Sequence, residues 1–382
     1  MLNPAETWPL WAVVALCAAC NEDATARSAA PRDAAVDADL TDAARPCAED
    51  PACDDDDPCT VDRCVAGDCA YARPDAAFQI VGTLSADAGA RGAFVQGDRV
   101  FVARGDRGYE AWAVETDAGV PAMQGGRAPV EGEGAFVGIL ADDQFLYVWH
   151  GDMRLTVLAR DSGDPVGSYS ARDVIKDVAL LPRYLYLAVF GKGVEGVDLQ
   201  DRAAPRRLGR APTPGRAEGV ARRGDEIVVA DGLAGLARVD IRQRDRPTPI
   251  DTRVTTEGRA VAVDARASIA VLAERGDGLG VVDLEAPGGP VRRATLHFEG
   301  DVLDVALLDD HTVAVAAGAA GLKIVDLLDP AAPRVWFEPA PGVACDHVHA
   351  DGRRLVATMG GSVLVGALRC PEPEVEVDAG AP

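Results

Sequence analysis

A segment that ends in Val-Asp recurs along the chain at an almost constant interval. In four copies the aspartates are 42, 43 and 43 residues apart, and a proline follows each aspartate seven residues later. The aspartates are Asp198, Asp240, Asp283 and Asp326, and the prolines are Pro205, Pro247, Pro290 and Pro333. The same frame continues at 109–115, 154–159 and 362–368, which makes seven copies. A fixed period of this length is typical of solenoids and propellers.

Each copy has room for four short strands. An apolar stretch such as 226–230 precedes the Val-Asp segment, and a shorter one such as 178–181 comes before that. A fourth stretch, such as 205–210, follows the proline. Four strands in about 42 residues correspond to one blade of a β-propeller, and strands apolar on both faces suit sheets packed between two neighbours. We therefore predict an all-β, seven-bladed propeller over residues 77–369.

The four best copies read GVEGVDL, GLARVDI, GLGVVDL and GLKIVDL. They resemble the LVIVD repeat, which is named after its strand sequence and occurs in exported bacterial proteins. The resemblance implies a β-propeller at the cell surface and no particular activity.

The two ends of the repeat region predict how the ring closes. The last copy ends after its third strand, while the segment 78–84 precedes the first copy and is similar to the fourth strand at 166–169. We expect this N-terminal strand to complete the last blade, because that pairing leaves no open sheet edge.

An apolar run of 12 residues at 8–19 is too short for a membrane-spanning helix, which needs about 20. It is typical of a signal peptide, here 1–19. Cys17-Ala18-Ala19-Cys20 resembles the lipobox of bacterial lipoproteins, although Cys17 stands where leucine is usual. The resemblance implies acylation of Cys20, with anchoring in the cell envelope, at the outer membrane or surface of a Gram-negative bacterium. An ordinary secretory signal is the alternative.

Two further segments lack the apolar residues that a core requires. Residues 20–46 consist largely of Ala and Asp and predict a disordered tether. Residues 370–382 form an acidic C-terminal tail.

Residues 47–73 contain five cysteines: Cys47, Cys53, Cys59, Cys64 and Cys69. We predict a small disulfide-rich module, because exported segments this short are stapled by disulfides. The part 54–69 resembles a cysteine motif of extracellular surface proteins that carries no known chemistry. Ca²⁺ bound by the aspartate run 54–57 with Asp62 is an alternative, whereas an oxidising compartment disfavours zinc.

Cysteine parity suggests a further bridge. With Cys17 removed and Cys20 acylated, seven cysteines remain. We hypothesise that Cys370 pairs with one cysteine of the module and that Cys345 stays free and buried. The alternative is a Cys345–Cys370 bond, which leaves one thiol free in the module.

The charge of the chain excludes one class of partner. The formal net charge is −23, with 38 basic and 61 acidic residues. A surface this acidic repels phosphate backbones, so nucleic-acid binding is not expected.

Two short segments contain residue types that could bind a metal ion or a nucleotide. Cys345, His347 and His349 alternate along one strand and share a face, but their span of roughly 13 Å excludes one zinc ion bound by all three. A site that uses two of them, completed from elsewhere, remains open. The sequence GKGVEG at 191–196 fits G-x-G-x-x-G but lies between two strands, so we interpret it as a hairpin turn.

Four acids occupy similar frame positions in the innermost strands: Asp177, Glu218, Asp304 and Asp346. They could ring a mouth of the central channel and hold a cation, or they could be solvated strand ends. The Val-Asp aspartates recur in copy after copy, which indicates a role in the scaffold. No catalytic motif is present, so we assign no catalytic residues and no cofactor.

The function that the sequence favours is a lipid-anchored binding or scaffold module with a protein or glycan partner. The alternative is a propeller hydrolase or lactonase that uses a divalent cation in the channel, although the near absence of asparagine argues against such a site. A purely structural envelope protein is the third possibility.

Overall fold

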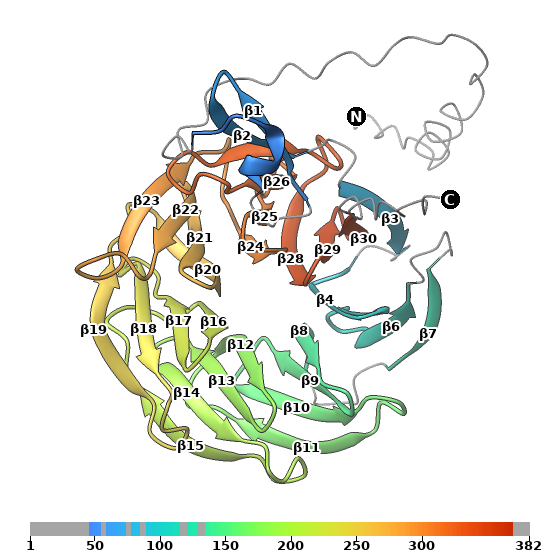
Figure 1. The fold of residues 1–382 in the computed structure, drawn as a ribbon. Helices are drawn as coiled ribbons and strands as arrows, with labels where there is room; N and C mark the ends of the chain where they lie inside the picture. Colours follow the sequence, from blue (N-terminus) through green and yellow to red (C-terminus); the bar gives the residue numbers. More distant parts are fainter. Residues whose placement is uncertain are drawn as a thin grey trace, which may run out of the picture. The chain divides into compact units, whose positions relative to one another are not determined.

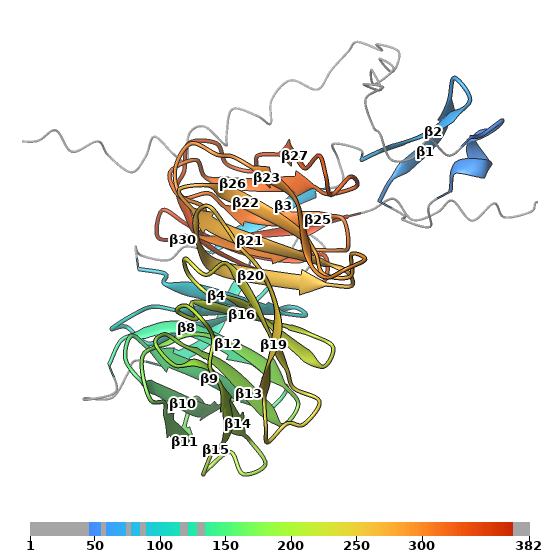
Figure 2. The ribbon, with the colours of Figure 1, turned by 90° about the vertical axis from the view of Figure 1, so that its left-hand side faces the viewer.

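A computed structural model describes residues 46–54, 59–73, 78–84, 89–114, 121–127 and 134–369. Within these residues, seven four-stranded antiparallel sheets surround a common axis (Figure 1), and Figure 2 shows the same ring from the side. The predicted seven-bladed propeller is therefore confirmed. The predicted signal peptide, nearly all of the linker, and the tail 370–382 lie outside the described residues. No helix in the described part of the chain is long and apolar enough to cross a membrane.

In each blade the strands follow one another from the central axis of the ring outward. Blades 1 and 2 comprise β4 (Gly92–Gln96), β5 (Arg99–Ala103), β6 (Tyr109–Ala113) and β7 (Ala122–Arg127), then β8 (Phe136–Ala141), β9 (Phe145–His150), β10 (Arg154–Ala159) and β11 (Pro165–Ser170). Blades 3 and 4 comprise β12 (Ile175–Leu181), β13 (Tyr184–Val189), β14 (Gly193–Asp198) and β15 (Arg206–Ala211), then β16 (Gly219–Arg223), β17 (Glu226–Ala230), β18 (Leu236–Asp240) and β19 (Thr248–Val254).

The remaining blades follow the same order. Blades 5 and 6 comprise β20 (Arg259–Arg266), β21 (Ile269–Arg275), β22 (Gly278–Asp283) and β23 (Val291–Leu296), then β24 (Asp304–Leu307), β25 (Thr312–Ala316), β26 (Leu322–Asp326) and β27 (Arg334–Phe337). Blade 7 comprises β28 (Cys345–Asp351), β29 (Arg354–Met359), β30 (Ser362–Leu368) and, from the N-terminal side, β3 (Phe78–Leu84). The sequence 191–196 falls on the hairpin between β13 and β14, as interpreted above.

The ring closes as predicted, with β3 paired antiparallel to β30 from Phe78 opposite Leu368 to Leu84 opposite Val363. The ring of Phe78 lies over Gly366, where an added Cβ would come within 2.5 Å of it. Because Phe78 also packs on Phe337 of blade 6, at 5.6 Å between ring centroids, the closing strand is held by two blades.

The hydrophobic core lies in layers between neighbouring blades. One cluster combines Leu185 and Val197 of blade 3 with Tyr147 and Leu155 of blade 2, and comparable clusters occupy the other junctions. Strands in such layers are buried on both faces, which explains the continuous apolar runs of the sequence.

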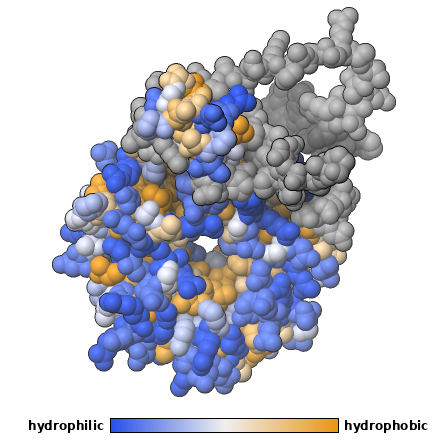
Figure 3. Space-filling view, in the orientation of Figure 1, coloured by the Kyte–Doolittle hydropathy of each residue, from blue (hydrophilic) through white to orange (hydrophobic). Residues whose placement is uncertain are grey.

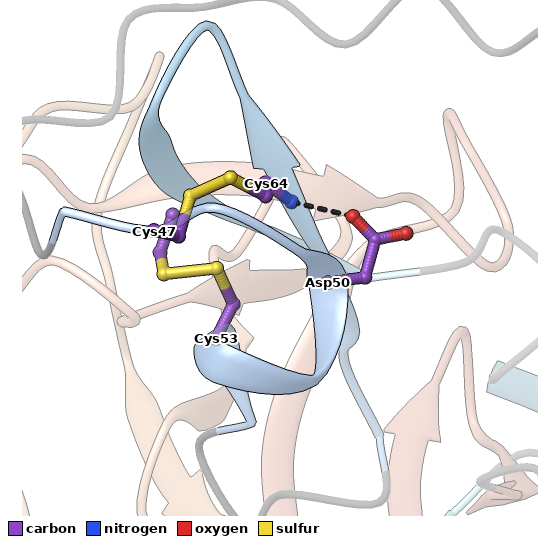
Figure 4. The surroundings of a disulfide bond; sticks show 5 residues. Cys47, Asp50, Cys53 and Cys64 are labelled. Atoms are coloured by element: carbon purple, nitrogen blue, oxygen red, sulfur yellow. Dashed lines mark hydrogen bonds between the residues drawn. A yellow bond between two sulfur atoms is a disulfide. The ribbon is translucent and has the colours of Figure 1, made fainter.

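The cysteine module contains one 3₁₀ turn, η1 (Asp50–Cys53), and a hairpin of β1 (Val61–Val65) and β2 (Asp68–Ala72). Disulfides join Cys47 to Cys64 and Cys53 to Cys69. Figure 4 shows the first bond beside Asp50, whose carboxylate accepts the N–H of Cys64 at 2.8 Å. Cys59 is also disulfide-bonded, and its partner, like the predicted bridge of Cys370, lies outside the described residues.

Candidate functional site

The innermost strands of all seven blades line a central channel of about 770 Å³. Figure 3 shows its opening at the centre of the ring. The four acids at similar frame positions of the repeat all line this channel: Asp177, Glu218, Asp304 and Asp346. Asp264, His347 and His349 line it as well. Asp264 is not among the acids predicted from the sequence, where its one signal is its place in the inner-strand segment 261–264.

Three channel aspartates connect neighbouring blades through backbone hydrogen bonds. Asp177 accepts the N–H of Val178 on its own strand and the N–H of Val220 on the next blade, at 2.8 and 2.9 Å. The equivalent donors are Ala265 and Leu307 for Asp264, and Val305 and Val348 for Asp304. Each carboxylate therefore links the innermost strand of its own blade to the innermost strand of the next blade.

Burial raises the pKa of two of these aspartates. It raises the pKa of Asp177 to about 6, although the two backbone hydrogen bonds oppose the shift. It raises the pKa of Asp264 to about 6 in the same way. The carboxylate of Glu218 accepts a hydrogen bond from a side chain instead: Arg259 of blade 5 donates its Nε–H to it at 2.7 Å.

Two histidines of β28 contact the backbone of blade 1 at the junction between blades 7 and 1. Nε2 of His347 lies 2.9 Å from the carbonyl oxygen of Ala93, and its Nδ1 lies 2.5 Å from the carboxylate of Asp304. Burial lowers the pKa of His347, but the Asp304 carboxylate outweighs it and the pKa ends above its ordinary value. Burial lowers the pKa of His349 to about 3, so this imidazole is neutral and its Nδ1 accepts the N–H of Val95 at 3.3 Å.

Cys345 is a free, fully buried thiol, which agrees with the hypothesis drawn from cysteine parity. The alternative Cys345–Cys370 bond is therefore wrong. Its Sγ lies 3.9 Å from the carbonyl oxygen of His347, and burial raises the pKa of the thiol. Among the described residues, the sole His, Cys, Asp and Glu side chains clustered tightly enough for a metal are Cys47, Cys53 and Cys69, whose sulfurs belong to the disulfides.

The recurrent Val-Asp aspartates are turn residues, as their recurrence indicated. In blade 3, Asp198 accepts the N–H of Gln200 at 2.8 Å and pairs with Arg206 at 3.0 Å. The same backbone bond joins Asp240 to Arg242, Asp283 to Glu285, and Asp326 to Leu328. An aspartate that bonds to the backbone two residues later stabilises a turn, which explains its place at the end of the third strand.

We predict that the mature protein binds no stoichiometric Ca²⁺ in the channel, because backbone and arginine donors already occupy the carboxylates of Asp177, Asp304 and Glu218. Elemental analysis of the purified protein and melting curves with and without EDTA test this. We expect no metal and no shift, since only a ligand of the folded state raises the melting temperature. One Ca²⁺ per chain that Glu218→Gln removes would contradict the prediction.

No family model matches the chain, and no curated protein matches it. Among solved structures, the crystal structure of the computationally designed Ika8 protein superposes with a TM-score of 0.55 at 11% sequence identity. The match covers 76% of this chain and 99% of that one. At this identity the similarity shows the fold alone: the chain is similar to Ika8 in architecture, and it is a seven-bladed β-propeller with a small disulfide-rich module before the ring.

Proposed function

We propose that the chain is an exported lipoprotein of the LVIVD-repeat type whose propeller serves as a non-enzymatic binding module in the cell envelope. The observation that carries the binding role is the use of the channel acids as contacts between blades. A channel-bound cation of a propeller hydrolase would need those same carboxylates free, whereas a binding module needs only a rigid ring.

Export and anchoring rest on the chain before the ring. The apolar run 8–19 ends at Cys20, and the disulfides of Cys47–Cys64 and Cys53–Cys69 suit an oxidising compartment. Two or more acyl chains on Cys20, each worth about 0.8 kcal/mol per buried CH₂, would anchor the protein durably. The tether up to residue 46 would then hold the ring away from the membrane.

The lipid anchor predicts a specific loss on mutation. Cys20→Ser should abolish incorporation of a labelled fatty acid and move the protein from the membrane fraction to the soluble fraction, because serine offers no thiol for acylation. Mass spectrometry of the mature N-terminus measures the modification directly. Ser28→Ala, which lies outside the lipobox, is the control and should leave both unchanged. Equal membrane association of the Cys20→Ser protein would overturn the anchor, and a wild-type protein found in the soluble fraction would support plain secretion.

A further inference from the structure

Blade 3 has a charge opposite to that of the whole chain. Residues 171–216, which comprise blade 3 and parts of the connections on either side of it, contain nine Arg and Lys against five Asp and Glu, in a chain whose net charge is −23. Such a local reversal attracts anions to one place on a protein that otherwise repels them.

Three arginines of this region line one groove of about 410 Å³, which we call the arginine groove: Arg172, Arg207 and Arg210, together with Leu208 and Gly209. Arg172 follows β11 of blade 2, while the others belong to β15, the outermost strand of blade 3. The groove therefore lies where the outer strands of two neighbouring blades meet.

A β-bulge explains why Arg207 and Arg210 share a face. Residues three apart on a regular strand point to opposite faces of the sheet. In β15, however, Arg207 lies opposite Val197 and Arg210 lies opposite Glu195, so Leu208 and Gly209 together face a single residue of β14. The extra residue in the bulge shifts the alternation of side chains by one position, so both arginines lie on the same face of the sheet as Glu195.

The three guanidinium groups differ in their partners. Arg207 is oriented by Glu195, whose fully buried carboxylate lies 3.8 Å from the Arg207 Nε and also accepts the hydroxyl of Tyr169. Arg172 and Arg210 are exposed, and no carboxylate of the described residues pairs with either. The nearest acid in sequence, Asp173, instead accepts the N–H groups of Val174 and Gly191 at 2.8 and 3.2 Å.

We propose that the arginine groove binds a phosphate group, carried on a small molecule, a glycan or a lipid. A guanidinium presents a planar set of donors that matches phosphate oxygens, and several guanidinium groups in one groove are a recurring solution for this ligand. The net charge of −23 on the whole chain disfavours an extended polyanion, so an isolated phosphate group is the better ligand. The proposal names a ligand class for the binding module proposed above, but it depends on neither export nor lipidation.

Calorimetric titration of the intact protein with inorganic phosphate and with glucose 6-phosphate tests the site at low ionic strength. We expect saturable binding that weakens with added salt. Arg210→Gln and Arg172→Gln should each weaken it about tenfold, the size expected for one charge-assisted hydrogen bond. Both side chains are exposed, so the melting temperature should stay unchanged.

Arg206→Gln is the matched control, because it removes the same charge from the same strand. Arg206 does not line the groove, and its guanidinium pairs with Asp198 at 3.0 Å. Binding should survive this change. The proposal is overturned if no saturable phosphate binding occurs, or if Arg206→Gln weakens it as much as Arg210→Gln does.

A second arm distinguishes the sources of the phosphate. Co-sedimentation with vesicles containing phosphatidic acid, compared with vesicles of phosphatidylcholine alone, reports a lipid-borne phosphate. If glucose 6-phosphate binds and the vesicles do not, the ligand is a soluble or glycan phosphate. Failure of both arms would overturn the site, while the Cys20 experiment on membrane attachment would be unaffected.

Discussion

Replacing Phe78 with alanine should lower the free energy of unfolding by about 3–5 kcal/mol, the usual cost of truncating a buried phenylalanine. Phe78 is 4% exposed, and its ring fills the space above Gly366 and against Phe337. The substitution should also loosen the pairing of β3 with β30, since this ring is the largest buried side chain of the closing strand. Urea unfolding followed by circular dichroism measures the effect.

Ile80→Ala is the control for that experiment. Ile80 lies on the same strand, but its side chain is 48% exposed. Its loss should therefore change stability by no more than about 0.5 kcal/mol. If Phe78→Ala were as mild as Ile80→Ala, the closing strand would not hold the ring in the way described.

Asp304→Ala should lower the free energy of unfolding by roughly 3 kcal/mol, because it leaves the N–H groups of the buried Val305 and Val348, and the half-buried His347, without their acceptor. The loss affects the junction of blades 6 and 7 directly. Asp346→Ala provides the comparison, since this neighbouring acid also lines the channel but is exposed. We expect it to change stability by no more than about 0.5 kcal/mol.

Asp304→Ala should also alter the pH dependence of the free energy of unfolding. The folded state raises the pKa of His347 above its ordinary value of 6.5, chiefly through the Asp304 carboxylate that opposes the effect of burial. A raised histidine pKa stabilises the fold fully below the unfolded value and ceases to do so as the pH rises through the folded value. Wild-type protein should thus lose this contribution above neutral pH. Asp304→Ala should show a flatter profile, and an unchanged slope would contradict the role of the pair.

Local pattern was enough to predict the blades. A strand, its turn and the next strand are contiguous, so the Val-Asp segment and the proline seven residues later identify each repeat without any knowledge of its neighbours. Closure by 78–84 could also be predicted, because a final copy lacking its fourth strand leaves an edge that a spare strand must cover.

The chemistry of the channel could be predicted only in part. The repeat frame places Asp177 and Asp304 at the channel, since equivalent positions of a propeller face the same axis. It does not reveal that their partners are the N–H groups of Val220 and Val348, which are 43 and 44 residues away on the next blade. Cysteine parity did favour a free, buried Cys345, which the structure confirms, but parity alone left a Cys345–Cys370 bond open as an alternative.

The sequence by itself therefore determined the number of blades, their strand order and the way the ring closes, because those features depend on contiguous pattern and on the need to cover sheet edges. The tertiary structure decided which polar groups are used in the scaffold and which remain available to a ligand. The arginine groove illustrates this division: the arginines are visible in the sequence, but only the bulge in β15 and the approach of Arg172 from blade 2 bring three of them together.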